Sequence, residues 1–159
     1  MAEELVCNYY KMSPSQWRSP KYDIKTLRDL EAGEIINGPF AQIVRYQGSP
    51  KGSALGSDRY DFYKVCLQDH TILKTLRDSP YLKLLPFCLY VIVHELIHIV
   101  RFSRFLQNFE ATHHEKLREE RRVHCHTVSV LRPVRMEGLD QVLAFFARWH
   151  EPIDGLASP

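Results

Sequence analysis

The stretch Val91-Ile-Val-His-Glu-Leu-Ile-His-Ile-Val100 decides how the rest of the chain is arranged. Its two histidines, His94 and His98, are four positions apart, so in a helix both imidazoles project from one face. Glu95 follows the first histidine and lies about a quarter turn further round the helix. All other residues of the stretch are apolar, and an ionisable group that is buried needs a partner. The pattern therefore predicts a buried helix whose polar side chains meet a small cation.

This His-Glu-x-x-His spacing is typical of helices that hold zinc through both histidines and use the glutamate as a general base. In such a site Glu95 reaches a water rather than the metal. A hydrolytic zinc site usually has three protein ligands and one open position. We therefore expect one Zn²⁺ per chain, bound by His94, His98 and a third ligand from elsewhere, with Glu95 as a catalytic residue.

The phase of the next predicted helix, from about 114 to 131, selects the third ligand. One stripe at three- and four-residue spacing consists of Leu117, Glu120, His124, Val128 and Leu131. This stripe predicts that Glu120 faces inward and binds the metal. Glu119 shares a partial stripe with Val123 and Val130 and stays an alternative. His124 is expected either to orient Glu120 or to replace it as a ligand.

Other histidines give weaker signals. His126 lies near the end of the same helix, where an imidazole could donate a hydrogen bond to the oxyanion formed when water attacks a carbonyl. An equally open interpretation is that His124 and His126 are simply one buried and one surface histidine. His113 and His114 are expected to be solvated, and His70 has no spacing argument behind it.

The motif followed by a glutamate on a downstream helix resembles the gluzincin branch of the zincin metallopeptidases, over about residues 85–131. The extension H-x-x-G-x-x-H of another zincin branch is excluded, because Arg101 and Arg104 stand at its glycine and histidine positions. The resemblance implies a zinc metalloprotease acting on a peptide or protein that lies extended on a sheet edge beside the motif helix. The chain departs from that branch at His124, where an aspartate is common.

The chain is expected to form one α+β domain over residues 1–159. A small antiparallel sheet in the N-terminal half would pack on a mainly helical C-terminal half built round the long motif helix. Residues 1–22 suggest an irregular arm with a short helical turn near 14–17. The expected strands are 40–46 and 59–67, and the expected helices are 23–31, 71–77, 81–109, 114–131 and 139–149.

Composition indicates a cytoplasmic protein without a nucleic-acid partner or a membrane span. The formal net charge is only +2, the four cysteines form no C-x-x-C pair, and Glu3 and Glu4 stand where a secretory signal would be basic and then apolar. The continuous apolar run 84–93 is far shorter than the roughly 18–20 residues that cross a bilayer. The oligomeric state is left open.

Two other functions fit parts of the pattern. Glu95-x-x-His98 and Glu120-x-x-x-His124 on adjacent helices would suit a non-haem di-iron protein, although that class needs Glu-x-x-His twice and two further glutamates. Alternatively, the chain is a non-enzymatic interaction domain with a structural metal site, binding an acidic partner or nucleic acid through a basic surface. That surface would consist of Lys116, Arg118, Arg121, Arg122, Arg132 and Arg135, with glutamates interleaved among them.

Overall fold

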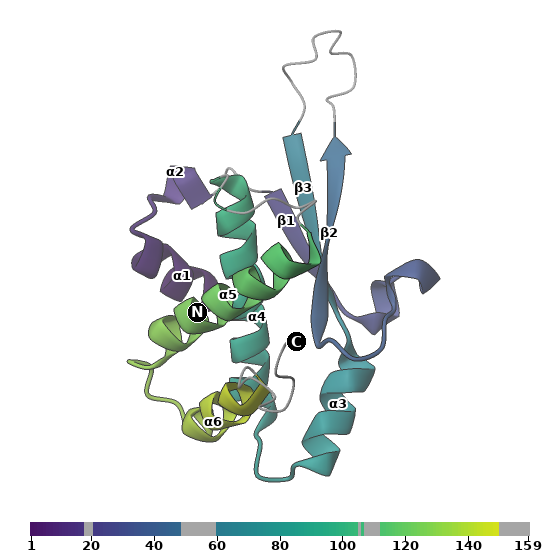
Figure 1. The fold of residues 1–159 in the computed structure, drawn as a ribbon, viewed down its shortest axis with the longest axis vertical. Coiled ribbons are helices and arrows are strands. Elements are labelled where there is room, and N and C mark those ends of the chain that lie inside the picture. Colours follow the sequence, from purple (N-terminus) through teal and green to yellow (C-terminus); the bar gives the residue numbers. More distant parts are fainter. Residues whose placement is uncertain (18–20, 49–59, 105, 107–111, 150–159) are drawn as a thin grey trace, which may run out of the picture.

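The computed structural model describes residues 1–17, 21–48, 60–104, 106 and 112–149 (Figure 1). Its helices are α1 (Ala2–Tyr10), α2 (Pro14–Trp17), α3 (Asp69–Asp78), α4 (Leu84–Ser103), α5 (His113–Leu131) and α6 (Leu139–Trp149). Its strands are β1 (Lys21–Lys25), β2 (Ala41–Gly48) and β3 (Tyr60–Leu67), with 3₁₀ turns at Leu27–Asp29 and Ala32–Glu34. The α+β class expected from the sequence is confirmed.

Helix α4 is the central element, as predicted. It contacts α1, α5, α6 and strand β2, and Figure 1 shows α5 crossing in front of it. Its apolar side chains point in all directions and several, including Phe87, Leu96 and Ile97, have no exposed surface. A helix that is hydrophobic all round belongs in an interior. By length and composition α4 is also the one described helix that could cross a membrane, but 72% of its apolar window is buried within the protein.

Helix α4 begins later than the sequence suggested, at Leu84 instead of residue 81. The reason is Pro86, which has no amide hydrogen and is tolerated only in the first turn of a helix. Starting at Leu84 places Pro86 third in the helix, where its missing donor costs nothing. The helix ends at Ser103, not near residue 109, and residues 105 and 107–109 lie outside the described part.

The sheet has the strand order β1-β3-β2. Strands β2 and β3 pair antiparallel, with Ile43 opposite Val65, so the predicted pair is confirmed. Strand β1 was not predicted, and it runs parallel to β3 with Ile24 also opposite Val65. The sheet is therefore mixed, and β1 and β2 form its two edges.

The helix predicted over residues 23–31 is wrong. The segment forms the end of β1 and then a single 3₁₀ turn. Its apolar residues therefore do not form a helical stripe, and Asp23 is not an N-cap. The Asp23 carboxylate accepts a hydrogen bond from the next amide, Ile24, whereas an N-cap would bind the amide two or three residues on. A nine-residue segment is also too short to be a stable helix without packing.

The irregular arm predicted for residues 1–22 is also wrong in part. Helix α1 packs on α4 and α5, and its Val6 is completely buried. Glu3 and Glu4 in the first turn suit the positive end of the helix dipole, and Lys11 ends the helix with a φ of 51°. The short helical turn predicted near residues 14–17 is confirmed as α2.

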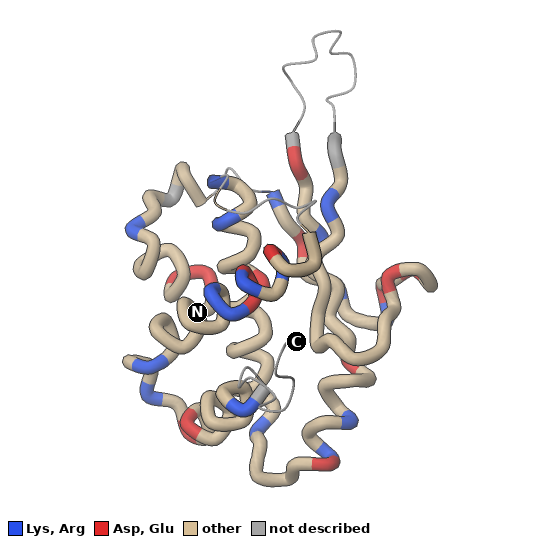
Figure 2. The backbone as a smooth tube through the Cα atoms, in the orientation of Figure 1, with Lys and Arg blue, Asp and Glu red and all other residues tan. Residues whose placement is uncertain are grey.

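The remaining helices follow the prediction closely. Helix α5 begins at His113 because Thr112 and Glu115 form a capping box, in which each side chain bonds the other residue's backbone. Acidic and basic side chains alternate along its exposed first half (Figure 2). Helix α6 has the predicted bounds, and α3 extends the predicted 71–77 by two residues at its start and one at its end.

Candidate metal centre

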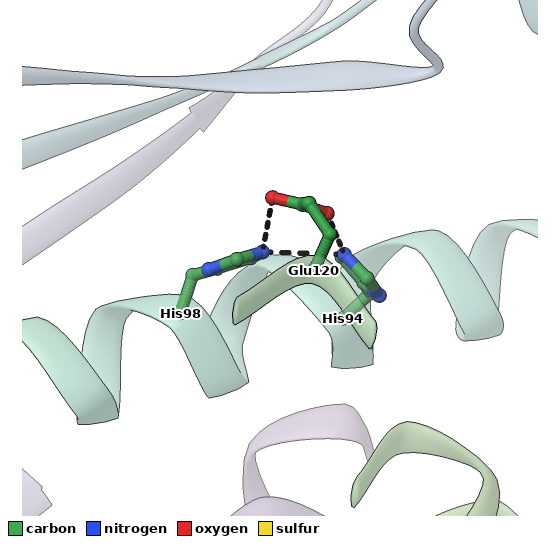
Figure 3. A group of neighbouring side chains, drawn as sticks. All are labelled: His94, His98 and Glu120. Atoms are coloured by element: carbon green, nitrogen blue, oxygen red, sulfur yellow. Dashed lines mark hydrogen bonds and ion pairs between the residues drawn. The ribbon is translucent and has the colours of Figure 1, made fainter. Parts of the chain in front are cut away.

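His94, His98 and Glu120 meet where α5 crosses α4 (Figure 3). The Nε2 atoms of the two histidines are 3.2 Å apart. Glu120 places its Oε2 3.2 Å from Nε2 of His94 and its Oε1 3.2 Å from Nε2 of His98. The structure therefore brings together the two predicted histidine ligands and the glutamate that helix phase had favoured.

These separations suit a bound cation. Donors about 2.0–2.1 Å from a tetrahedral zinc are about 3.3 Å from one another, close to the three separations of 3.2 Å. Each Nε2 carries either one proton or one lone pair, so each serves one hydrogen bond well. Three contacts that share two such nitrogens cannot all be good hydrogen bonds. A cation between the groups would satisfy both nitrogens and the carboxylate together.

The ionised state of Glu120 also fits a ligand role. Partial burial opposes its ionisation, but hydrogen bonds from His94 and His98 outweigh burial and hold the pKa of this carboxyl well below its usual value. Glu95 shows the opposite shift, since burial raises its pKa and outweighs the opposing effect of His94 and His98. The two carboxyl groups thus differ in basicity, as a ligand and a proton acceptor should.

A pocket of about 150 Å³ opens beside the cluster. His94, Glu95 and Glu120 all line it, so the predicted base and two of the three ligands face one space. Its other walls are mainly apolar and come from Phe40, Tyr90, Val91 and Phe146, with Ala41 at the start of β2. The rings of Tyr90 and Phe146 are stacked, with centroids 3.7 Å apart. The arrangement can accept a carbonyl group that carries an apolar neighbour.

Glu119, the alternative ligand, is used elsewhere. Its carboxylate pairs with Arg101 of α4 through Nε and with Arg122 through Nη1 at 2.9 Å. Adjacent residues of a helix project about 100° apart, so Glu119 and Glu120 meet different parts of α4. Glu119 is not brought into the cluster.

His124 lies beside the cluster but outside it. Its Nδ1 is hydrogen-bonded to the hydroxyl of Tyr90, and both side chains are buried. Tyr90 is one turn before His94 on α4, and His124 is one turn after Glu120 on α5. The structure thus gives His124 a contact that joins the two helices, and the group of possible metal ligands does not include it.

His126 turns away from the cluster. Its Nδ1 is 2.8 Å from the hydroxyl of Tyr9 on α1, and its ring also contacts Tyr10. Six positions separate it from Glu120, which corresponds to about 240° round the helix. Burial, with Arg101 and Arg122 nearby, lowers its pKa. The oxyanion role expected of His126 is therefore not supported by its position.

The other histidines of the prediction lie outside the cluster. His113 and His114 are exposed, as expected, and Nε2 of His70 is 3.1 Å from the carbonyl oxygen of Ile36. The contact of Arg101 with α5 was not predicted. Its signal was present, because a single arginine in an apolar helix requires a counter-charge.

No family model, curated protein or solved structure matches this chain. The metal centre is therefore inferred from the residues of this chain alone. In the described part of the chain, one group of three residues has the donors and spacing to hold a metal ion, and that group is His94, His98 and Glu120.

Proposed function

We propose that the protein is a zinc-dependent hydrolase that cleaves peptide bonds, with His94, His98 and Glu120 as ligands. The observation that carries the proposal is the set of three donors at 3.2 Å separations in a pocket shared with Glu95. Two nitrogen ligands and one carboxylate oxygen form a donor set common in catalytic zinc sites. The resemblance of the motif to gluzincins favours the same activity.

Glu95 is the general base in this proposal. Zinc bound at the three ligands would lower the pKa of a water and polarise the substrate carbonyl. Glu95 accepts the proton of the attacking water at its carboxylate and then transfers it to the departing amine nitrogen.

A peptide or protein is the substrate that the surroundings favour. Strand β2 is an edge of the sheet, and its first residue, Ala41, lines the pocket. An extended chain can pair with the backbone of an edge strand, and alternate side chains then enter pockets on one side. The apolar walls formed by Phe40 and Phe146 favour a hydrophobic side chain next to the bond that is cleaved.

The test is elemental analysis of protein purified without chelator, together with hydrolysis of a mixture of unstructured peptides. We expect one zinc per chain, lost in His94→Ala and in Glu120→Ala. Glu95→Gln should keep the zinc and lose roughly 100-fold or more of the hydrolysis. Glu137→Gln, the same change at a side chain that is 87% exposed, is the matched control and should alter neither.

Other results would redirect the proposal. Two irons per chain with visible absorbance would favour the di-iron alternative. A folded protein that binds no metal would favour an interaction domain without a metal site, and bound zinc without hydrolysis would favour one with a structural metal site. Full hydrolysis in Glu95→Gln would exclude this residue as the base.

A further inference from the structure

Three polar contacts in succession join α4 to α5. Tyr90 meets His124, the two histidines meet Glu120, and Arg101 meets Glu119. The order rises along α4 and falls along α5, so the helices run in opposite directions through the cluster. The candidate ligands are therefore bracketed on both sides by contacts that fix how α5 lies on α4.

The choice between two adjacent carboxylates needs an explanation. Glu119 and Glu120 have identical side chains about 100° apart on α5, so a rotation of the helix by that angle would exchange them at the histidines. His94 and His98 cannot distinguish one carboxylate from the other by chemistry. A group outside the ligand set must select the rotation.

Arg101 is placed to make that selection. It lies three residues after His98, and its side chain and that of Glu119 are each only 8% exposed, whereas Glu120 is 47% exposed. The Nε of Arg101 donates to one oxygen of Glu119, and Arg122 donates to the other. Both oxygens of Glu119 are therefore held by guanidinium groups.

We propose that Arg101 is a positioning residue of the metal centre: its pairing with Glu119 fixes the rotation of α5 that presents Glu120 to His94 and His98. The pairing also neutralises a guanidinium that would otherwise compete with the cation for Glu120. This inference rests on the zinc site proposed above.

The behaviour of buried ion pairs makes the proposal testable. Removing one partner leaves an uncompensated charge, whereas replacing both partners with uncharged groups is often harmless. In Glu119→Gln, Arg101 loses its buried counter-charge and turns to Glu120, the next residue of α5, so zinc binding weakens. The double variant Arg101→Met, Glu119→Gln has no guanidinium to compete for Glu120, but it also lacks the pairing that fixes the rotation of α5, so zinc binding recovers only in part.

The measurement is the zinc dissociation constant, obtained by competition with a chromophoric chelator. Glu119→Gln should weaken binding at least tenfold, and the double variant should bind more tightly than the single variant but still several-fold more weakly than the wild type. Arg118→Met is the matched control, because Arg118 is an exposed arginine near the start of the same helix, and it should keep the wild-type zinc affinity. The absorption of bound Co²⁺ gives a second readout, since it changes when the carboxylate leaves the metal.

Thermal unfolding of each metal-free variant separates loss of fold from loss of affinity. If Glu119→Gln does not fold, Arg101→Lys replaces it, since lysine keeps the charge without the guanidinium contact, and it should weaken zinc binding several-fold. Wild-type affinity in Glu119→Gln or in the double variant would overturn the positioning role of Arg101, and a double variant no tighter than the single one would overturn its competition with the cation. If the wild-type protein itself binds no zinc, the proposed function fails, which is a distinct result.

Discussion

Zinc should stabilise the folded chain by an amount that can be calculated. The ligands come from two helices, and Glu120 is 22 positions beyond His98, so the complete site exists only when α5 is packed on α4. A ligand that binds only the native state, at a free concentration 100 times its dissociation constant, adds about 2.7 kcal/mol. For a domain of this size each kcal/mol raises Tm by about 2–4 °C, so the expected rise is about 5–11 °C.

The assay is calorimetry or circular dichroism at buffered free zinc concentrations, with a chelator-treated sample as the zero point. His98→Ala should abolish the rise, whereas His113→Ala, which removes an exposed histidine outside the cluster, should preserve it. An unchanged Tm in the wild-type protein, or an equal rise in His98→Ala, would refute the assignment of these ligands.

Two further predictions concern the scaffold. Hydrogen bonds from Lys64, the Glu31 backbone and Tyr46 lower the pKa of Glu34 to about 2. Ionised Glu34 therefore stabilises the folded chain fully above the unfolded pKa near 4.5, and this contribution to the free energy of unfolding disappears as pH falls towards 2. The difference in urea midpoint between wild type and Glu34→Gln should therefore shrink over that range, and a constant difference would contradict it. Gly138→Ala should cost about 1–2 kcal/mol in urea unfolding, because φ is +87° and the new Cβ would lie 3.0 Å from the Lys83 side chain. Gly33→Ala, with nothing within 4 Å, is its control; equal losses would refute the argument.

The sequence was most informative where spacing along one helix determines position. His94 and His98 share a face of α4 by their separation alone. The inward stripe of α5 was assigned wrongly, because Leu117 is 51% exposed whereas Glu119, Val123 and Val130 are buried, although Glu120 does reach the histidines. The strands β2 and β3 were also recognisable, because their aromatic and β-branched residues flank a loop-like segment. In each case the signal is local and repeats with the period of the element.

The missed elements depend on contacts between distant residues. Strand β1 pairs with β3 about forty positions later, and nothing within 21–25 distinguishes this from other short extended segments. Helix α1 is stabilised by packing Val6 against the core, which its own sequence does not reveal. Phe40 and Phe146 both line the pocket but are far apart in the sequence, so the periodicity of a single helix or strand could not predict that they meet.

The first six residues of α5, 113–118, are all exposed, and burial begins only at Glu119. The start of the helix is therefore held by its capping box, and its attachment to α4 begins at the turn that carries Glu120. Fraying of residues 113–118 would leave the three candidate ligands in place, whereas a backbone movement that separates Glu120 from His94 and His98 must lift the attached turn from α4. A metal bound at the proposed centre should therefore slow amide hydrogen exchange at Glu120 and leave exchange at residues 113–118 unchanged.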